Sequence, residues 1–548
     1  MPFLIYINMK KILILIIAIV SFISNAQNVG VISNTEFSDT GYTLFTLHQK
    51  TYLINNCGEV INEWTSTYLP GNAVYLLENG NLLRCGRTNS NNITFGGVGG
   101  RIELFDWDGN LLWGIFIDDI NIRQHHDVFP LPNGNILVLA AEVVNQNDAI
   151  NLGRDPNLLV DGRLFSEKII EIEPVGVDQY NVIWEWTVID HVVQDIDATK
   201  SNFNNVGLNE QLLDINFLNG LSGNENWLHV NSIQYNANLD QIILSSRNLS
   251  EIYIIDHSTT TAEAATNIGG NSGKGGDFLY RWGNPQSYRQ GTEMDRKLYG
   301  QHYPHWIQNG FTDENKIILF NNGFLRTPSF SEVFIINPPI NTLNNYAYVD
   351  NTAYLPIQPD YIYTNSNNFY SSIVSSAQRL QNGNTLICEG RTGEIFEIDV
   401  NENIVWEYVT PINTNDGTVF SPSETPVNNL TFRAIKYATD YPAFTNRTLT
   451  PGDPIENNPN ISNCNALSIT ENQFNENDVK LYPNPVIDYL TVDYNKNIDL
   501  IEIYSISGQL IKQVVNTKTI SFNNITSGLY ILKIRSGNAF LTKKILKE

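Results

Sequence analysis

One phrase recurs along this chain: an apolar segment, an Asn-Gly pair and a second apolar segment. The clearest copies span residues 74–83, 131–139 and 379–387. An Asn-Gly pair between two apolar runs predicts a β-hairpin, and a type I′ turn would require positive φ at both central residues. The repeat therefore predicts a chain built from antiparallel hairpins.

Each hairpin is followed by an alternating strand and then by a strand that carries a tryptophan. Residues 101–106 lead into 111–113 after the first clear copy, and residues 394–399 lead into 404–408 after the last. Weaker copies begin near Ile233 and Trp306, which gives five four-stranded units from about residue 73 to about residue 410. The tryptophans of the outer strands are expected to be packing residues rather than substrate contacts: Trp64, Trp113, Trp186 and Trp406.

A sixth unit can be assembled from both ends of the repeat region. Residues 51–54 and 60–64 supply strands at the front, and residues 432–437 supply one at the back. A ring closed by strands from both ends has no exposed sheet edge. The sequence therefore predicts an all-β fold, a six-bladed β-propeller over residues 27–456, with paired β-sandwiches or a solenoid as the alternative.

The N-terminus predicts export. Lys10 and Lys11 precede an apolar run from residue 12 to residue 20, and the small-residue site Ser24-Asn25-Ala26 follows. The run is shorter than the roughly 20 residues of a spanning helix, so residues 1–26 are expected to be a signal peptide cut before Gln27. We expect no transmembrane segment after its removal.

The charge is strongly acidic and unevenly distributed. The net charge is -24, and residues 479–548 carry nine Lys and Arg against five Asp and Glu. An acidic chain disfavours nucleic acid and anionic membranes as partners, because both require clustered cations. The change of sign marks a domain boundary near residue 478.

Four cysteines are too few for a disulfide scaffold, and they show no CxxC spacing that would favour zinc. Export permits disulfides. Cys57 and Cys464 lie near the two ends of the repeat region, so they are the preferred pair. Cys388, next to an apolar run, is expected to be a buried thiol.

The C-terminal region begins with a polar, Asn-rich segment, residues 457–478, which is typical of a linker. Residues 479–548 alternate like a small β-sandwich. Their opening Leu481-Tyr482-Pro483-Asn484-Pro485, the Ser527-Gly528-Leu529-Tyr530 strand and the Lys-rich end resemble the C-terminal sorting domain of type IX secretion substrates of Bacteroidetes. That resemblance implies the type IX secretion machinery as a partner and passage across the outer membrane. Whether the mature protein is released or stays at the cell surface is left open.

Five of the eight histidines fall in three short motifs, at residues 124–127, 227–232 and 300–306. Each motif starts the first strand of a repeat, and corresponding positions of a propeller meet at one end of its central channel. Three such histidines could bind a metal. Arg247 follows the second motif, however, and an obligate cation beside histidines favours an anion site for a sulfate or phosphate ester.

These motifs, in this order, resemble the bacterial arylsulfate sulfotransferase family. The similarity covers about residues 40–445 and includes the segments His125-His126-Asp127-Val128, Trp227-Leu228-His229-Val230-Asn231-Ser232 and Gly300-Gln301-His302. The resemblance implies a propeller that moves a sulfuryl group from a phenolic sulfate ester to a phenol through a sulfated histidine. It implies no cofactor, no metal and no nucleotide sulfate donor.

The resemblance also implies roles for single residues. His302 matches the nucleophile, and His229, Asn231 and Arg247 match the groups that hold the sulfate oxygens. His126 matches the histidine near the bridging oxygen, with His125 as the alternative. His305, three residues after His302, is left open as a partner or as the nucleophile itself.

Two other functions remain open at this stage: a surface propeller that binds sulfated or phenolic ligands without chemistry, and a sulfate-ester hydrolase. The polar stretches at residues 145–167 and 190–226 and the Gly-rich stretch at 269–276 are expected to be loops around the site. The sequence does not indicate which Phe and Tyr residues would line an aryl pocket.

Overall fold

The structure is a computed structural model that describes residues 27–341, 345–365, 368–460, 464, 479–506, 509–536 and 539–548. The predicted signal peptide and most of the predicted linker lie outside these residues. The chain splits into two compact units, residues 1–460 and 461–548. No helix among the described residues is long and apolar enough to cross a membrane.

The first unit is built from antiparallel sheets. Among its described residues, six sheets contain at least four strands each, and β13 pairs with β14 in a separate parallel ribbon. The first sheet consists of β2 (Tyr42–Leu47), β3 (Lys50–Ile54), β4 (Val60–Thr65) and β27 (Ile435–Tyr437), and the second of β5 (Leu69–Leu76), β6 (Leu82–Arg87), β7 (Gly100–Phe105) and β8 (Leu111–Phe116). The third consists of β9 (Ile122–Pro130), β10 (Ile136–Asn145), β11 (Arg163–Val175) and β12 (Gln179–Thr187), and the fourth of β15 (Val230–Asn236), β16 (Gln241–Ser246), β17 (Glu251–Asp256) and β18 (Tyr280–Trp282). The fifth consists of β19 (His302–Trp306), β20 (Ile317–Asn321), β21 (Glu332–Ile336) and β22 (Tyr361–Tyr363), and the sixth of β23 (Ser376–Arg379), β24 (Thr385–Glu389), β25 (Glu394–Ile398), β26 (Ile404–Val409) and β1 (Gly30–Asn34).

The helices and the parallel ribbon lie in the connections between strands. They are α2 (Gln146–Asn151), α3 (Thr261–Ala264), β13 (Val192–Val193), β14 (Leu213–Asp214) and the 3₁₀ turns η1 (Pro156–Leu158), η2 (Val188–His191), η3 (Val206–Leu208), η4 (Pro285–Tyr288), η5 (Glu293–Asp295) and η6 (Pro442–Phe444). Thr260 and Glu263 form a reciprocal capping box at the start of α3. The predicted long loops therefore contain short ordered elements of their own.

The predicted hairpins are present, but the predicted turn type is wrong. Only the glycine of each Asn-Gly pair has positive φ, as at Gly80 (89°), Gly134 (90°) and Gly383 (92°). In the first of these turns Leu77 N–H donates to Asn81 O, and Asn81 N–H donates to the side chain of Asn79. The loop thus has three residues and ends in a left-handed glycine, and the asparagine side chain caps the turn instead of its backbone adopting positive φ.

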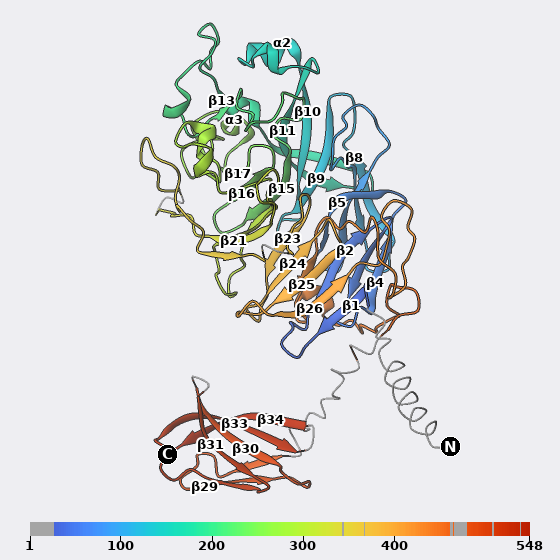
Figure 1. Ribbon diagram of the computed structural model, residues 1–548, viewed down its shortest axis with the longest axis vertical. Helices are drawn as coiled ribbons and strands as arrows, with labels where there is room; N and C mark the ends of the chain where they lie inside the picture. Colours follow the sequence, from blue (N-terminus) through green and yellow to red (C-terminus); the bar gives the residue numbers. More distant parts are fainter. Residues whose placement is uncertain are drawn as a thin grey trace, which may run out of the picture. The chain divides into compact units, whose positions relative to one another are not determined.

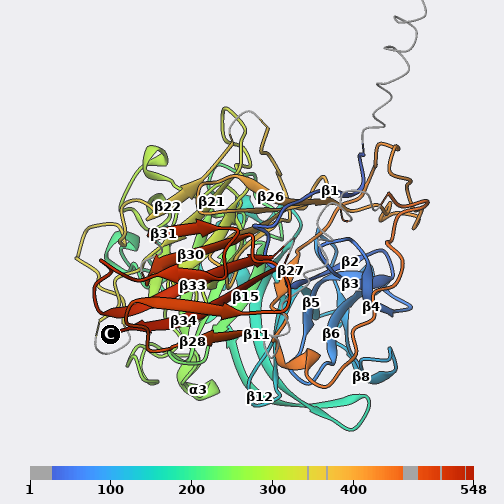
Figure 2. The ribbon, with the colours of Figure 1, turned by 90° about the horizontal axis from the view of Figure 1, so that it is seen from below.

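The sheet predicted from both ends of the repeat region is also present. Leu44 of β2 pairs with Ile435 of β27, and Figure 2 shows these two strands side by side. A further pairing joins the ends: β1 adds to β26, with Val31 opposite Tyr408. In Figure 1 the orange strands β24–β26 accordingly lie beside the blue strands β1 and β2.

Apolar clusters fill the spaces between consecutive sheets. Each cluster combines residues from one sheet and the next, and one cluster combines residues of the sixth sheet with residues of the first. In the last of these, Ile395 and Trp406 pack with Phe45 and Tyr52. Every sheet therefore packs on two neighbours.

The outer-strand tryptophans are packing residues, as expected, and they also join neighbouring sheets. Trp64, Trp113, Trp186 and Trp406 are buried, and each donates its ring N–H to a backbone carbonyl in the next sheet or in a connection between its strands, the last of them to Asn56, between β3 and β4. Trp282 of the fourth sheet does the same to Pro356. The fifth sheet has no such tryptophan in its outer strand, and there the hydroxyl of Tyr361 donates to Glu402.

The second unit contains two antiparallel sheets around one apolar core, as alternation predicted. One sheet consists of β28 (Lys480–Tyr482), β29 (Tyr489–Asp493) and β32 (Thr519–Ser521), and the other of β30 (Leu500–Ser505), β31 (Leu510–Val515), β33 (Gly528–Ser536) and β34 (Ala539–Lys547). Residues from both sheets, such as Leu490 and Ile503, share that core. The alternation of buried and exposed side chains in β33 is that of a two-layer β fold.

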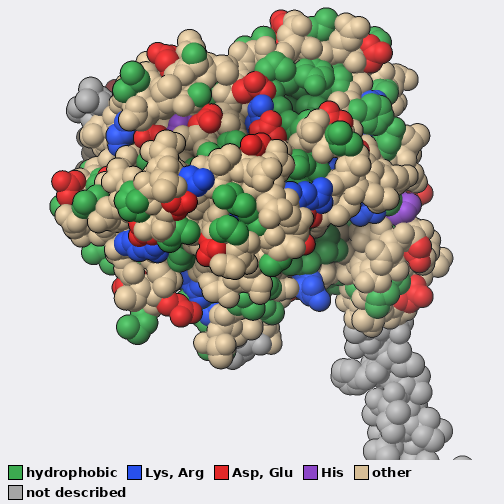
Figure 3. Space-filling view, turned by 90° about the horizontal axis from the view of Figure 1, so that it is seen from above, with side chains coloured by type: hydrophobic (Ala, Val, Ile, Leu, Met, Phe, Trp, Pro, Cys, Tyr) green, Lys and Arg blue, Asp and Glu red, His purple; other side chains and the backbone are tan. Residues whose placement is uncertain are grey.

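Cys57 and Cys464 are disulfide-bonded, whereas Cys85 and Cys388 are free and buried. The predicted bond and the predicted buried thiol are thus confirmed. On the face shown in Figure 3, Lys and Arg side chains lie scattered among Asp and Glu side chains. This face offers no clustered cations of the kind that nucleic acid requires.

Candidate active site

Three neighbouring inner strands bring the histidine motifs together. His126 lies in β9, His229 immediately precedes β15, and His302 is the first residue of β19; β15 contacts both β9 and β19. The rings of His126 and His229 meet edge to face, with centroids 4.7 Å apart. His302 is close enough to act electrostatically on both of the others.

Each motif coincides with an irregularity in its strand. The pairing register shifts between Val138 and Ala140 opposite β9, between Val230 and Ile233, and between His302 and His305. His126 and His229 have φ of 50° and 48°, a left-handed conformation that is rare for histidine. Such bulges re-aim side chains, and the strain they carry is found mainly at functional sites.

Asn322 determines the tautomer of His302. The Asn322 amide donates from Nδ2 to the carbonyls of Ser371 (2.7 Å) and Val374 (2.9 Å), so its Oδ1 faces the ring. His302 Nδ1 lies 2.7 Å from that oxygen and must therefore carry the proton. The lone pair of His302 is consequently on Nε2.

The surroundings also keep His302 uncharged. Burial, together with the charge of Arg247, lowers the pKa of His302 to about 3. At neutral pH the ring is therefore a neutral imidazole with an available nitrogen, which is the form that acts as a nucleophile.

Arg247 is a cation without an ionic partner. No carboxylate in the described part of the chain forms a salt bridge with it; Nη1 lies 3.3 Å from Asn248 Oδ1, and the guanidinium stacks on Phe324 at 4.1 Å from the ring centroid. Burial is the largest cause that lowers the pKa of His229, and the charge of Arg247 is the second. A half-buried guanidinium beside neutral histidines is suited to an anion.

His125 and His126 form a short hydrogen-bonded chain. His125 Nε2 lies 2.9 Å from Glu167 Oε2, and the Nδ1 atoms of the two histidines lie 2.9 Å apart. When His125 donates to the carboxylate, its Nδ1 accepts the proton of His126, which leaves the lone pair of His126 on Nε2. Burial, and then the neighbouring His229, hold the pKa of His126 well below its usual range.

His229 and Asn231 present different groups. Asn226 donates from Nδ2 to His229 Nδ1 at 2.7 Å, so His229 carries its proton on Nε2 and is a donor there. Asn231 is fully buried and donates to the carbonyl of Gln301, while its Oδ1 has no hydrogen-bond partner among the described residues. One amide hydrogen of Asn231 remains for a ligand.

Aromatic rings surround this cluster, a feature that the sequence did not identify. Phe95, from the loop between β6 and β7, packs on His125, His126 and His229. Phe432 lies 6.3 Å from His126, between ring centroids. Together with Phe324 on Arg247, these rings can enclose an aryl group.

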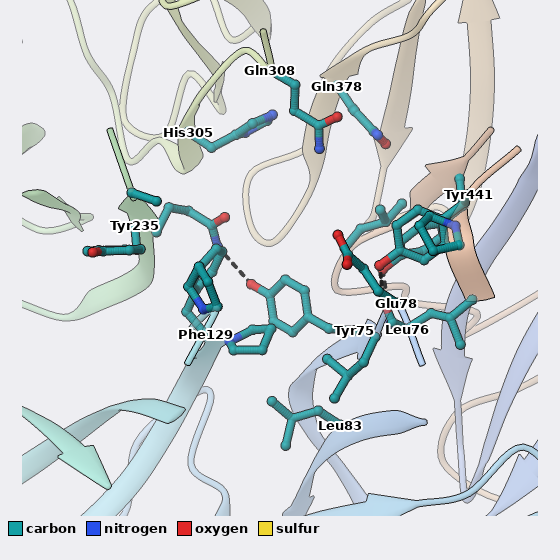
Figure 4. Close-up of a pocket in the computed structure, with 18 of the residues that line it drawn as sticks. Tyr75, Leu76, Glu78, Leu83, Phe129, Tyr235, His305, Gln308, Gln378 and Tyr441 are labelled. Carbon is teal, nitrogen blue, oxygen red and sulfur yellow. Dashed lines mark hydrogen bonds between the residues drawn. The ribbon is translucent and has the colours of Figure 1, made fainter. Parts of the chain in front are cut away.

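The structure brings His125, His126, His229, Asn231, Arg247 and His302 into this one cluster. It places His305 elsewhere: its ring lines a cavity at the other ends of the same strands, seen in Figure 4. Besides the aromatic rings, three polar contributors were missed from the sequence, namely Asn322, Glu167 and Asn226. Asn322 directly follows the last residue of β20.

No group of three or more His, Cys, Asp or Glu side chains within the described ranges is arranged to hold a metal ion. In the cluster His125 is hydrogen-bonded to both His126 and Glu167. The lone pair of His229 Nδ1 accepts from Asn226. The available groups are two ring nitrogens, one ring N–H, an amide and a guanidinium. That set can bind an oxyanion and attack it.

Comparison with known proteins points in the same direction. The model of the arylsulfotransferase (ASST) family matches residues 23–420, and the model of the secretion system C-terminal sorting domain matches residues 480–548. No curated protein matches the chain.

Solved structures resemble the chain only remotely. A protein of unknown function from Bacteroides caccae is 12% identical, with 73% of this chain and 99% of that chain covered and a TM-score of 0.38. A periplasmic gluconolactonase from Pseudomonas aeruginosa is 10% identical (68% and 96% covered, TM-score 0.31), and virginiamycin B lyase from Staphylococcus aureus is 11% identical (70% and 88% covered, TM-score 0.29). At these TM-scores they contribute nothing to the assignment of the site.

Proposed function

The chain belongs to the arylsulfotransferase family, and we propose that it transfers a sulfuryl group from a phenolic sulfate ester to a phenol in two displacements, with His302 as the group carrier. The observation that carries this proposal is the hydrogen bond from His302 Nδ1 to the amide of Asn322, which leaves a neutral Nε2. A covalent intermediate splits one difficult transfer into two easier displacements at the same sulfur.

In the first displacement His302 Nε2 attacks sulfur, an N–S bond forms, and the S–O bond to the aryl group breaks. Arg247, the Nε2–H of His229 and the amide of Asn231 hold the sulfuryl oxygens, where charge is concentrated. The bound ester adds a negative charge beside His126 and raises its pKa, so that His126 Nε2 takes up a proton from solvent and then donates it to the leaving phenolate.

In the second displacement the acceptor phenol gives its proton to His126 Nε2 and its oxygen attacks sulfur. The N–S bond breaks, which restores His302. Phe95, Phe324 and Phe432 are suited to hold the donor and acceptor rings in turn. His125 and Glu167 orient His126, and His125 remains the alternative proton carrier.

We also propose that the six sheets are blades of a closed propeller. Each sheet shares an apolar cluster with the next, the sixth shares one with the first, and the outer-strand hydrogen bonds run in the same order. The inner strands β9, β15 and β19 then start at one end of the central channel, where the histidines lie.

The location supports an ester donor. The sorting domain at residues 480–548 indicates export by type IX secretion, to the cell surface or the medium. We propose that residues 1–26 first direct the chain across the inner membrane. Outside the cytoplasm no nucleotide sulfate donor is supplied, and the sequence contains no P-loop that would hold one.

The test is release of 4-nitrophenol from 4-nitrophenyl sulfate, with and without a second phenol. We expect release that depends on the acceptor. Release without acceptor would indicate a hydrolase, and no release would indicate a binding protein. His302→Ala should lower the rate by about a thousandfold or more, and a sulfated peptide containing His302 should be trapped after brief exposure to donor.

His305→Ala is the matched control, because it removes a histidine three residues away that lines a different cavity. It should leave the transfer rate within about twofold of the original. If His305→Ala abolished transfer while His302→Ala did not, the nucleophile would be His305.

A further inference from the structure

A cavity lies at the opposite ends of the strands β9, β15 and β19 from the histidine cluster. It has a volume of about 870 Å³. One edge strand of each of the six sheets lines it near the strand's C-terminal end: β5, β9, β15, β19, β23 and β27. In that order they contribute Tyr75, Phe129, Tyr235, His305, Gln378 and Tyr437. Figure 4 shows His305, Gln308 and Gln378 on one side of this space and Tyr75, Phe129 and Leu83 on the other. Drug-sized ligands occupy cavities of this size in proteins, which span about 300–1,000 Å³.

A buried polar layer separates the cavity from the histidine cluster. Arg433 Nη2 lies 2.8 Å from Asp127 Oδ2, and the hydroxyl of Tyr75 donates to Asp127 Oδ1 at 3.0 Å. The guanidinium also stacks on Tyr303, 3.8 Å from the ring centroid. Each member of this layer is the next residue in the chain after a member of the proposed reaction centre: Asp127 follows His126, Tyr303 follows His302, and Arg433 follows Phe432. A ligand in the cavity is therefore held apart from His302.

The basic groups of the cavity are already neutralised. Lys436 Nζ lies 2.9 Å from Glu397 Oε2, with both side chains almost fully buried. Arg379 Nη2 lies 2.8 Å from Asp313 Oδ2. Asp39, Glu78 and Asp440 also line the cavity and form no salt bridge within the described ranges. A sulfate ester would meet these three carboxylates and no unpaired cation, so an anion is disfavoured.

One uncharged group of the lining, His305, favours a ligand that donates a hydrogen bond. His305 Nδ1 donates to the carbonyl of Tyr303, so its Nε2 is an acceptor, and no described residue occupies it. The hydroxyls of Tyr75, Tyr235 and Tyr441 already donate to Asp127, Asp240 and the carbonyl of Leu76. Aromatic and aliphatic side chains such as Phe129 and Leu83 also line the cavity, together with the amides of Gln308 and Gln378, and this mixture suits a flat ring that carries a polar group.

We propose that this cavity is a second binding site, for an uncharged aromatic compound with a hydroxyl group. The hydroxyl group donates a hydrogen bond to His305 Nε2. The site is distinct from the reaction centre and discriminates against sulfated aryl compounds. It does not depend on the sulfuryl-transfer chemistry proposed above.

The probe is 1-naphthol, titrated calorimetrically into the full mature chain without a sulfate donor. Gln308→Trp places a large ring at the exposed edge of the cavity, and His305→Leu removes the acceptor. Both variants should lower the affinity for 1-naphthol by about tenfold or more. A loss of this size corresponds to one hydrogen bond or one blocked ring contact. His305→Gln, which retains an acceptor, should restore most of the affinity.

Two controls separate this site from the reaction centre. Arg247→Leu alters only the histidine cluster and should leave the cavity site intact, and 1-naphthyl sulfate should not displace 1-naphthol from it. Gln509→Trp adds the same ring at an exposed position of the second unit and should have no effect. Equal affinity in Gln308→Trp, His305→Leu and the original chain would overturn the proposal, as would loss of all binding in Arg247→Leu.

Discussion

At the scale of single residues, the most informative contact is the one between Asn322 and His302. A nucleophilic imidazole needs its lone pair on the attacking nitrogen, and a neutral amide provides this without adding charge. A carboxylate at the same place would attract the imidazolium form. The amide thus fixes the position of the lone pair, while burial and the charge of Arg247 lower the pKa of His302 and keep the ring neutral.

Asn322→Asp should move the acid limb of the pH profile. The carboxylate stabilises protonated His302 and raises its pKa above the value of about 3. Activity of the original chain should stay flat from pH 7 down to about 5, whereas the variant should lose activity within that range as its His302 gains a proton. The measurement is kcat/KM against pH.

Asn322→Leu should lower kcat by about a hundredfold, because both tautomers of His302 become available. Asn321→Leu is the control, since that neighbour bonds to Lys297 O and Glu332 instead. Equal losses in the two leucine variants would mean that Asn322 has only a structural role.

The sequence could predict the histidines and Arg247 because short motifs carry them. It could not predict the partners that set their protonation. Glu167 meets His125 across 42 residues and Asn322 meets His302 across 20, so these contacts depend on strand register and on bulges. His305 illustrates the same limit: a bulge separates it from His302, although the two are three residues apart.

At the scale of elements, hairpins and four-stranded units follow directly from alternation and Asn-Gly pairs. The addition of β1 to β26 does not, because residues 30–34 carry no turn signal that links them to the last unit. Between sheets, ionic contacts add to the apolar clusters. His257, after β17, lies between Glu171 of β11 (2.9 Å) and Asp240 before β16 (2.7 Å).

This contact predicts a pH-dependent stability. Burial alone would lower the pKa of His257, but the hydrogen bonds to Asp240 and Glu171 outweigh it and raise the pKa to about 9. The stabilisation by His257 is fully present below about pH 6.5 and is lost as the pH rises through about 9. His257→Gln should reduce the free energy of unfolding by on the order of 2 kcal/mol at pH 6.5 and by much less at pH 10.

Urea denaturation at the two pH values measures this difference. His48→Gln serves as a control, since no described residue forms a salt bridge with His48. A difference between His257→Gln and the original chain that did not shrink at high pH would contradict the ionic explanation.

At the scale of the whole molecule, the two units have separate cores and separate tasks. Every residue assigned to the reaction centre lies between residues 95 and 432, and the sorting domain contributes none of them. A chain that ends at Asp478 should therefore keep the transfer rate per mole of protein within about twofold, still cross the inner membrane, and fail to pass the outer membrane. Transfer assays on purified protein and fractionation of the producing cells give the two readings.

The pairing of β27 with β2 has a consequence for timing. Leu44 and Ile435 are partners although almost the whole first unit lies between them, so this contact is made only when the chain is present up to that strand. Phe432, which packs on His126 in the proposed reaction centre, and Arg433, which pairs with Asp127, directly precede β27 in the chain. A chain still threading through a membrane therefore has its histidines outside but no finished pocket, and we expect catalysis to begin only after the last of these strands has emerged.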